Sequence, residues 1–400
     1  MNQKMVKEMM ARKETPAYVF DLDKLNTRLK WLKELLQGTA KLCYAMKANP
    51  FLIEPMGKQV DIFEVCSPGE FRICERAHIP MENIVLSGVN KEKRDIEYVV
   101  NTYKGKGKYT IESWNQLELL EACAKAKNIK IDVLIRVTSG NQFGMDEVDV
   151  CKIIENRNQY PALNFKGLQF YSGTQKKKIV KIEKELLYLD KLCRVLEKNY
   201  DFSVEELEYG PGFFVAYFEN ESDLYDDNLM KEFVKLLKQL QFRGEIILEM
   251  GRFVVADCGY YFSKIIDQKI NHGQNYCIID GGINHVNYYG QTMAMKIPKH
   301  IHVPYDHKKV IEEKQANQDW NICGSLCTVG DVLVKNMPLY DPQTGDVLIF
   351  ENIGAYSITE GIYLFLSRNL PKVFFYSDKQ GLQLVRESLT TDSINSVNGL

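Results

Sequence analysis

The sequence predicts an α/β protein in which a closed (β/α)8 barrel is followed by a mainly β domain. Short apolar runs alternate with longer amphipathic runs between about residues 40 and 255. This alternation is the pattern of parallel strands joined by helices. There are eight such apolar runs, which favours a closed barrel over an open doubly wound sheet. After about residue 262 the runs are bounded by Gly, Pro and Asn without long helical periods between them, and this indicates a β domain.

The predicted barrel occupies residues 36–262, and its elements follow one another in a regular order. Helical periodicity fills the gaps between strands, as in Ser113–Lys127 and Lys176–Lys198. Each strand is separated from the next by a helix or by enough residues for one. The eight predicted strands are Leu42–Tyr44, Asp61–Val65, Ile84–Leu86, Tyr109–Ile111, Val133–Val137, Gly167–Phe170, Leu207–Tyr209 and Ile246–Leu248.

The predicted β domain comprises residues 1–35 and 263–400. Tyr18–Phe20 is an apolar strand that precedes the barrel, and we expect it to join this domain. The polar stretch His302–Asp319 is expected to be an excursion on the surface. The domain's predicted strands include Tyr276–Asp280, Val332–Val334 and Val347–Phe350.

Composition and charge describe an ordinary soluble chain and exclude several classes of partner. The formal net charge of −2 gives no reason to expect nucleic acid. No apolar run approaches the roughly 20 residues of a transmembrane helix, so we expect no membrane contact. The first ten residues lack the apolar core and cleavage site of a signal peptide, and the predicted location is cytoplasmic.

Cysteines and lysines are numerous but form few suggestive clusters. The ten cysteines are scattered without a Cys-x-x-Cys pair, so neither a zinc site nor a disulfide framework is predicted. Local basic clusters occur at Lys104–Lys108 and Lys176–Lys178. Their simplest interpretation is solvated helix ends and loops.

Polar residues and glycines follow the predicted barrel strands at their C-terminal ends, where such barrels place catalytic groups. Lys47 comes directly after the first strand, among small neighbours. Taken singly, each position has a simpler interpretation as an exposed lysine, a tight turn or a surface ion pair. Together they predict a site for pyridoxal phosphate (PLP). The other positions are Glu64, Ser67, Ser87, Ser113, Arg136, Tyr171, Thr174, the Gly210-Pro211-Gly212 turn, Glu249, Gly251 and Arg252.

PLP requires groups of each kind in this set. Its aldehyde needs a lysine to form a Schiff base, and Lys47 is placed for that. Its ring nitrogen needs a carboxylate such as Glu249 to stay protonated, so that the ring can act as an electron sink. Its phosphate needs backbone N–H groups and a cation. The Gly210–Gly212 turn and the Gly251-Arg252 pair follow strands seven and eight, where barrels commonly bind phosphate.

Seven ordered motifs make the assignment specific. They are Tyr44-Ala-Met-Lys-Ala-Asn49, Glu64-Val-Cys-Ser67 with Gly69-Glu70, Gly167-Leu-Gln-Phe-Tyr-Ser-Gly-Thr-Gln175, Gly210-Pro-Gly212, Glu249-Met-Gly-Arg252, Gly324-Ser-Leu-Cys327 through Gly330-Asp331, and Gly354-Ala-Tyr356. With these motifs the chain resembles the fold-type III (alanine racemase-like) PLP enzymes of the ornithine/diaminopimelate decarboxylase branch, from about Thr15 to Phe375. The resemblance implies a PLP-dependent decarboxylase and a head-to-tail homodimer with active sites at the subunit interface.

The resemblance also implies individual roles. Lys47 would carry PLP as a Schiff base, and Glu249 would pair with the pyridine nitrogen. Cys327 would reprotonate the carbanion after carbon dioxide leaves; a thiol with an ordinary pKa of about 8.5 stays mostly protonated near neutral pH. The alternative for Cys327 is a buried small residue. Cys327 and Tyr356 would reach the PLP of the other subunit. The remaining cofactor-binding positions are Glu64, Tyr171, Thr174, Gly210, Gly212, Gly251, Arg252 and Tyr356.

Three positions depart from the pattern of that family. Tyr171 stands where a histidine usually covers the ring, and it offers stacking without the charge of an imidazole. Thr328 stands where an acid usually helps to receive the substrate's distal amine, and an unpartnered distal ammonium would cost affinity. Tyr288 stands where diaminopimelate enzymes carry an arginine. We therefore predict Tyr288 and Thr328 as substrate-binding positions and a substrate other than free diaminopimelate, lysine or ornithine.

The chain is closest in character to members of this branch from biosynthetic clusters, such as the butirosin-type decarboxylase of glutamate bound to an acyl carrier protein, or decarboxylases of siderophore precursors. A carrier-tethered substrate would need no clamp for a distal charge, and the lysine clusters would then receive an acidic carrier. Three alternatives stay open. They are a free amino-acid decarboxylase, for example of diaminopimelate; an amino-acid racemase on the same fold; and a non-catalytic PLP-binding paralogue.

Overall fold

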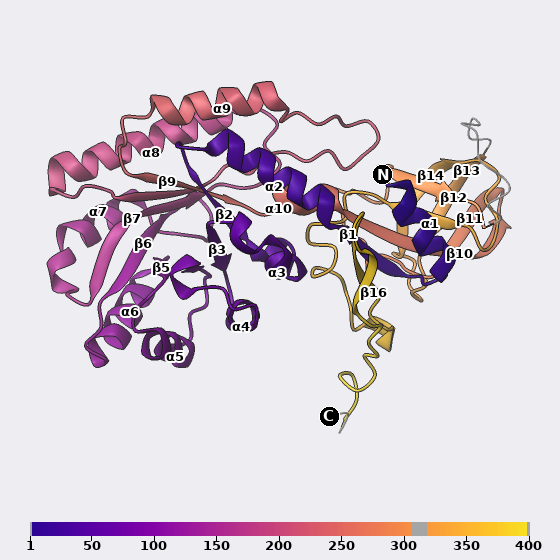
Figure 1. The fold of residues 1–400 in the computed structure, drawn as a ribbon, viewed down its shortest axis with the longest axis horizontal. Helices are drawn as coiled ribbons and strands as arrows, with labels where there is room; N and C mark the ends of the chain where they lie inside the picture. The colour runs from indigo at the N-terminus through magenta and orange to yellow at the C-terminus, as the bar shows by residue number, and fades with distance from the viewer. Residues whose placement is uncertain (1, 306–317, 398–400) are drawn as a thin grey trace. The chain divides into compact units, whose positions relative to one another are not determined.

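The computed structural model describes residues 2–305 and 318–397. These residues divide into two compact units (Figure 1). The barrel unit comprises Arg28–Val215 and Asp223–Val254. The β unit comprises Met1–Thr27, Ala216–Ser222 and Val255–Leu400, so a short segment between the last two barrel strands belongs to it.

Eight parallel strands close a barrel, as the sequence predicts. Each of the eight predicted runs overlaps one of these strands. The ring closes where Cys43 of the first barrel strand pairs with Glu249 of the last. The strands are β2 (Lys41–Ala45), β3 (Ile62–Val65), β4 (Ile84–Leu86), β5 (Lys108–Ile111), β6 (Ile131–Val137), β7 (Leu163–Tyr171), β8 (Glu206–Gly210) and β9 (Glu245–Met250).

Helices follow the strands, and two of them begin at serines that the sequence places at strand ends. The Ser67 hydroxyl accepts a hydrogen bond from the Glu70 N–H at 3.2 Å, and the Ser113 hydroxyl does the same for Gln116 at 3.2 Å. Both serines are therefore helix N-caps. The helices are α2 (Leu22–Leu36), α3 (Ile53–Met56), α4 (Pro68–Arg76), α5 (Lys93–Tyr103), α6 (Trp114–Ala126), α7 (Glu147–Glu155), α8 (Ile179–Tyr200), α9 (Asp227–Gln239) and α10 (Arg252–Val255).

The barrel interior changes from apolar to polar towards the C-terminal ends of the strands. Its apolar layer consists of Cys43, Ile62, Val85 and Ile247. Two residues further along the same strands, and so on the same face, stand Glu64, Ser87 and Glu249. At the opposite end an ion pair joins Lys108 to Glu206, the first residues of β5 and β8. The fold thus places the titratable groups around Lys47 at one end of the barrel.

The β unit contains a nine-stranded sheet. Along its main path the order is β14-β13-β11-β10-β1-β16-β17, while β15 pairs with β10 and β12 pairs with β15. Strand β1, which contains the predicted Tyr18–Phe20, joins this sheet as expected and runs antiparallel to β10 and parallel to β16. The strands are β1 (Ala17–Asp21), β10 (Gly259–Asn271), β11 (Gln274–Ile279), β12 (His300–Val303), β13 (Gln318–Cys323), β14 (Val332–Leu339), β15 (Val347–Phe350), β16 (Lys372–Ser377) and β17 (Gly381–Arg386).

Helix α1 (Gln3–Arg12) precedes this sheet and covers part of its core. Its Met5 and Met9 are buried in one cluster with Tyr260 and Phe374. Within residues 1–35, β1 is therefore flanked by helices, and the expected β character is confined to one strand. Of the expected surface excursion at 302–319, residues 306–317 lie outside the described residues.

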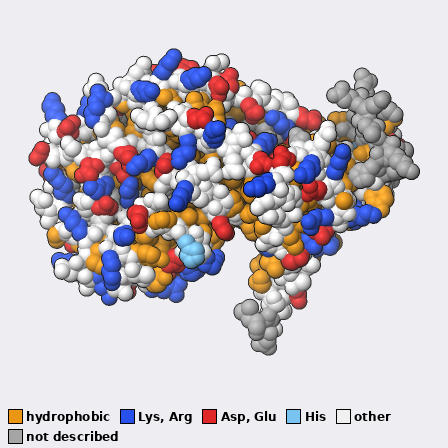
Figure 2. Space-filling model, in the orientation of Figure 1, with side chains coloured by type: hydrophobic (Ala, Val, Ile, Leu, Met, Phe, Trp, Pro, Cys, Tyr) orange, Lys and Arg blue, Asp and Glu red, His pale blue; other side chains and the backbone are white. Residues whose placement is uncertain are grey.

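Surface charge matches the near-neutral composition. Lysine and arginine side chains intermingle with aspartate and glutamate on the face drawn in Figure 2, and the formal net charge is −2. Within residues 2–305 and 318–397, no helix has both the length and the apolar character needed to cross a bilayer.

Candidate active site

Lys47 lies at the polar end of the barrel, in the short 3-10 turn Met46–Ala48 that follows β2. Its amine donates to Glu64 Oε2 at 2.5 Å and to Glu249 Oε1 at 3.0 Å. The sulfur of Cys66 lies 3.9 Å from the same nitrogen. The Lys47 side chain is 37% exposed, whereas both glutamates are buried. The amine is thus held between two carboxyl groups and remains accessible.

The two glutamates around Lys47 differ in their affinity for protons. Burial opposes ionisation of Glu64, but the charge and hydrogen bond of Lys47 outweigh it and lower the Glu64 pKa to about 2. Burial, together with the charge of Glu64, raises the Glu249 pKa to about 7. Because one ammonium balances only one carboxylate, Glu249 is the partner that retains a proton. The Glu249 carboxyl shares that proton with Glu64 in a hydrogen bond.

A third acid, Glu208 of β8, lies in the barrel interior and is completely buried. The amide of Gln169 donates to Glu208 Oε1 at 2.5 Å and to the Ser87 hydroxyl at 3.2 Å, and Ser87 hydrogen-bonds to Glu64. Burial, followed by the charges of Glu249 and Glu64, raises the Glu208 pKa well above its ordinary value. Glu208 and Gln169 were not among the predicted site residues. Their spacing of two residues from Gly210 and Tyr171 was the available signal, since alternate residues share a face.

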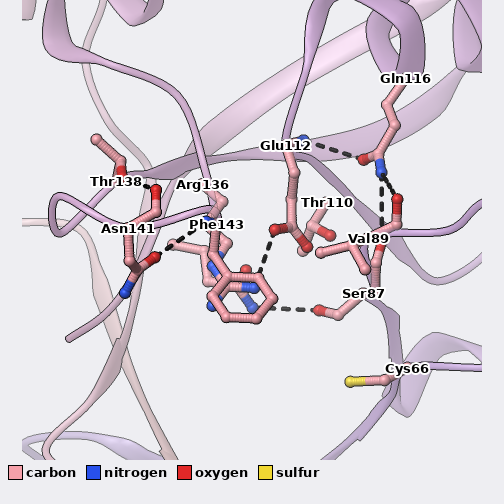
Figure 3. A network of polar contacts seen from close by, with 12 residues as sticks. Cys66, Ser87, Val89, Thr110, Glu112, Gln116, Arg136, Thr138, Asn141 and Phe143 are labelled. Atoms are coloured by element: carbon pink, nitrogen blue, oxygen red, sulfur yellow. Dashed lines mark hydrogen bonds and ion pairs between the residues drawn. The ribbon is translucent and has the colours of Figure 1, made fainter. Parts of the chain in front are cut away.

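A second polar cluster lies after β5 and β6 (Figure 3). Arg136 donates to Glu112 Oε2 at 3.1 Å, and the Phe143 ring lies 4.9 Å from its guanidinium carbon. Nearby, the Lys91 amine donates to the Gln116 side chain at 3.2 Å. Burial lowers the Lys91 pKa to about 8. The cluster ties the loops after β4, β5 and β6 together on one side of the barrel mouth.

The loops after β7 and β8 meet on another side of the mouth. A Cβ added to Gly210 would lie 2.5 Å from the Tyr171 ring, so the ring packs directly on that glycine. Gly212 has a φ of +62°, and a Cβ there would lie 2.0 Å from the Gly173 carbonyl oxygen. Thr174 hydrogen-bonds to the Tyr171 hydroxyl. Gly210 is therefore required by the packing of the Tyr171 ring, and Gly212 by its φ and by the close approach of the Gly173 backbone.

Gly251 and Arg252 follow β9, and Arg252 begins α10. The positive charge of Arg252 acts on the Tyr171 hydroxyl, whose pKa is nevertheless raised by burial and by Glu249. Lys47, Glu64, Tyr171, Thr174, Gly210, Gly212, Glu249, Gly251 and Arg252 thus all lie at the C-terminal end of the barrel strands.

Cys327 and Thr328 lie in the β unit, on the loop between β13 and β14, and both are exposed. The buried Asp331 holds this loop. Its carboxylate accepts the Leu326 N–H at 2.7 Å and the Ile283 N–H at 2.9 Å. The thiol is therefore presented by a loop whose base is fixed.

Tyr356 and Tyr288 also lie in the β unit. Tyr356 is half-buried, with a φ of 67°. The Tyr288 side chain is buried against Tyr217, and its hydroxyl donates to the Glu351 carbonyl at 2.8 Å. The roles of both tyrosines towards cofactor or substrate stay predictions.

The two lysine clusters lie in different surroundings, and their role in receiving an acidic carrier stays a prediction. Lys176 is buried and pairs with Glu185 at 2.6 Å. In the other cluster, Lys108 begins β5, so Lys104–Lys108 lies at the N-terminal end of the barrel strands, opposite Lys47. In the Lys176–Lys178 cluster the charge of Lys176 is therefore paired with Glu185. The Lys104–Lys108 cluster lies at the end of the barrel opposite the candidate active site.

The model of the family described as "Pyridoxal-dependent decarboxylase, pyridoxal binding domain" matches residues 22–256, which is more than half of the chain. The chain belongs to the pyridoxal-dependent decarboxylases. PLP is accordingly its cofactor, and the family's reaction is decarboxylation, as the sequence motifs predict.

Curated relatives of this decarboxylase act on several substrates. It is 26% identical to the 2-[(L-alanin-3-ylcarbamoyl)methyl]-2-hydroxybutanedioate decarboxylase of Staphylococcus aureus, with 90% of this chain and 93% of the relative aligned. It is also 26% identical to the L-glutamyl-[BtrI acyl-carrier protein] decarboxylase of Niallia circulans, with 98% and 96% aligned. Identity to the diaminopimelate decarboxylase of Zymomonas mobilis is 24%, over 88% and 85%.

Solved structures confirm the fold of this decarboxylase. The diaminopimelate decarboxylase of Helicobacter pylori complexed with L-lysine superimposes with a TM-score of 0.84 over 97% of this chain and 98% of that one, at 22% identity. The lysine decarboxylase of Selenomonas ruminantium gives a TM-score of 0.80 over 95% and 97%, at 19% identity.

The residues of the decarboxylase's barrel unit fit PLP. Lys47 supplies an accessible primary amine, and Glu249 is a buried carboxyl group beside it. The glycine turn at Gly212 lies so close to the Gly173 backbone that a Cβ there would clash with it. Arg252 supplies a cation near Tyr171. An amine, an acid, an aromatic ring and a glycine turn are the donor set that the aldehyde, ring nitrogen, ring face and phosphate of PLP require.

Proposed function

We propose that this protein decarboxylates an amino acid or an amino-acid-derived substrate, with Lys47 binding the aldehyde of PLP and Cys327 acting as the general acid. The observation that carries the proposal is the position of the Lys47 amine between Glu64 and Glu249. Two carboxyl groups orient the amine, and its exposure allows an aldehyde to reach it.

Bound PLP supplies an electron sink that accepts the electron pair left by departing carbon dioxide. In this proposal Glu249, a buried carboxyl group beside Lys47, pairs with the ring nitrogen as a carboxylate and keeps that nitrogen protonated. Tyr171 covers the ring. Thr174, the Gly210–Gly212 turn, Gly251, Arg252 and Tyr356 surround the phosphate.

Cys327 returns a proton to the substrate's α-carbon. Its thiol is exposed, and Asp331 fixes the base of its loop. We propose that it does so in a homodimer, where Cys327 and Tyr356 of one subunit complete the site of the other. This arrangement accounts for an accessible thiol at a loop tip that the β unit itself leaves uncovered.

The proposed substrate has no distal ammonium group. Thr328 is a neutral side chain next to the proposed acid, so a distal ammonium would have no carboxylate partner there. Tyr288 would border the same substrate site. The relatives from S. aureus and N. circulans act on an alaninyl-carbamoyl hydroxybutanedioate and on a carrier-bound glutamyl group. We propose a small-molecule substrate of the first kind or a carrier-bound one of the second.

Product analysis of the PLP-loaded protein tests this function. The panel comprises free lysine, ornithine and diaminopimelate, glutamyl-loaded carrier protein, and citrate-derived diaminopropionate. We expect carbon dioxide release from one of the last two. Release from a free basic amino acid alone would contradict the substrate proposal, and α-proton exchange without carbon dioxide would indicate a racemase.

Two variants test the assigned roles. Lys47→Ala is expected to abolish the visible absorption of the cofactor's bond to lysine, and Cys327→Ala is expected to slow product formation by roughly a hundredfold or more. Cys151→Ala, on α7, is the matched control. A Cys327→Ala enzyme as active as the Cys151→Ala enzyme would refute the acid role.

A further inference from the structure

The β unit contains a polar cavity that the proposed function does not use. Its volume is about 680 Å³. The lining comes from the segments around Thr15, Asp280, Ser325 and Lys372 and from the loop that carries Arg368. A cavity of this size accommodates a group larger than a single water.

Arg368 is the cation in this cavity with no carboxylate partner among the described residues. Its guanidinium donates to the Ser325 carbonyl at 2.7 Å, which uses one of five N–H donors. Lys372, by contrast, pairs with Glu14 at 3.5 Å and with Glu387 at 3.3 Å. Burial raises the pKa of the nearby Asp331 carboxylate and the charge of Arg368 opposes that rise, but Arg368 forms no direct ion pair among the described residues. Arg368 therefore offers unused N–H donors to a ligand.

The acid in the cavity wall, Asp280, does not take that charge. Its carboxylate accepts hydrogen bonds from Thr15 at 2.6 Å, from Ser263 at 2.7 Å and from the Lys264 N–H at 2.9 Å. Three donors disperse its negative charge locally. The Asp280 carboxylate thus accepts several hydrogen bonds from its own surroundings, whereas the Arg368 guanidinium still has N–H groups that can donate to a ligand.

The backbone holds Arg368 in place before any ligand arrives. Leu366 and Ser367 have φ values of 60° and 50°, a region that non-glycine residues rarely adopt. Asn395 donates to the Ser367 hydroxyl at 3.0 Å, and Thr391 donates to the Arg368 carbonyl at 3.0 Å. A strained loop tied on two sides is typical of a ligand clamp.

The cavity also borders the loop of the proposed general acid. Ser325 lines the cavity and precedes Cys327 by two residues. Two residues of chain span at most about 7 Å. Arg368, which donates to the Ser325 carbonyl, is therefore close to the loop that carries the Cys327 thiol.

We propose that Arg368 recognises a distal carboxylate of the substrate in this cavity. The inference rests on the proposed function and specifies its substrate class as an amino acid whose side chain ends in a carboxylate. Arginine binds a carboxylate through two parallel hydrogen bonds, whereas it repels a distal ammonium. The neutral Thr328 on the same loop is consistent with that preference.

Calorimetric titration with citrate tests the inference without requiring turnover. We expect the PLP-loaded wild type to bind citrate, Arg368→Gln to bind it at least tenfold more weakly, and Arg368→Lys to retain part of the affinity. Lys379→Gln, an exposed cation on the turn between β16 and β17, is the matched control. Absence of citrate binding, or equal binding by Arg368→Gln, would overturn the inference.

Inhibition kinetics then connect the cavity to the substrate. Citrate should compete with the substrate in the wild type and lose this effect in Arg368→Gln. Non-competitive inhibition would place the anion elsewhere and overturn the assignment. If no substrate releases carbon dioxide, the proposed function fails, while citrate binding still tests the Arg368 site on its own.

Discussion

Replacing Glu249 with glutamine is expected to stabilise the cofactor-free protein at alkaline pH and to leave its stability near pH 4.5 unchanged. Burial and the Glu64 charge raise the Glu249 pKa from 4.5 to about 7. Between these two values the folded protein keeps a proton that the unfolded chain has released. The free energy of unfolding therefore falls as pH rises, by about 1.36 kcal/mol per pH unit, or roughly 3 kcal/mol in all.

Glutamine cannot ionise, so the free energy of unfolding of the variant does not include the decrease that Glu249 causes as pH rises. A gain of roughly 3 kcal/mol at about pH 8 corresponds to about 4 °C in Tm, because the unfolding entropy of a chain of 400 residues is roughly 0.8 kcal/mol per kelvin. Glu64 does not interfere above pH 4.5. Its lowered pKa of about 2 gives stability that is fully present above the ordinary value of 4.5 and is lost only as pH falls towards 2.

Urea unfolding of the cofactor-free protein at about pH 5 and about pH 8 measures the difference. Glu245→Gln is the control, because Glu245 lies on the same strand but is exposed and pairs with Lys41 at 2.6 Å. The raised pKa of Glu208 lowers stability with rising pH in all three proteins. The wild type and the control should therefore lose roughly 3 kcal/mol more between the two pH values than Glu249→Gln. A wild type equally stable at both, or three parallel profiles, would refute the reasoning about shared charge.

Three further substitutions test other parts of the structure. Gly212→Ala places a Cβ 2.0 Å from the Gly173 carbonyl at a φ of +62°; spectroscopic titration should show PLP affinity reduced by roughly tenfold or more, and unchanged affinity would argue against a cofactor loop. Asp331→Asn weakens the hold on the general-acid loop and should lower kcat roughly tenfold or more without changing PLP affinity, whereas a parallel loss of both would indicate a general folding defect. Lys176→Met removes the buried ammonium from the half-buried Glu185, which keeps hydrogen bonds from Ser172 and Tyr209. It should cost about 1–3 kcal/mol in urea unfolding, so a neutral effect would contradict the importance of this ion pair.

The barrel strands could be predicted because buried parallel strands are apolar on both faces. Ile246–Leu248 is such a run, and it lies inside β9. The same signal fails in the β unit. Strand β10 extends over Gly259–Asn271, but its second half is largely exposed and polar, so its length does not appear as an apolar run.

Site residues that belong to a sequence motif could be predicted. Residues whose burial or pairing depends on tertiary contacts could not. Lys47 and Glu249 belong to motifs, and their side chains lie together in the structure, while their roles stay predictions. Glu208 looks like an ordinary polar residue between Leu207 and Tyr209, and only its register opposite Gln169 on β7 turns it into a buried acid. Lys176 looked like a surface lysine, because its pairing with α8 is a tertiary contact.

The position of β1 has a consequence for synthesis of the chain. This strand lies between β10 and β16. Both of these partner strands are synthesised after the last barrel strand, β9. At roughly 5–20 residues per second, the interval from Asp21 to Ser377 is about 20–70 s. The barrel sequence emerges before β10, so during the first part of that interval the apolar segment Ala17–Phe20 has neither neighbour and is a natural binding site for chaperones. Deleting β1 would leave β16 without the parallel strand along which it aligns.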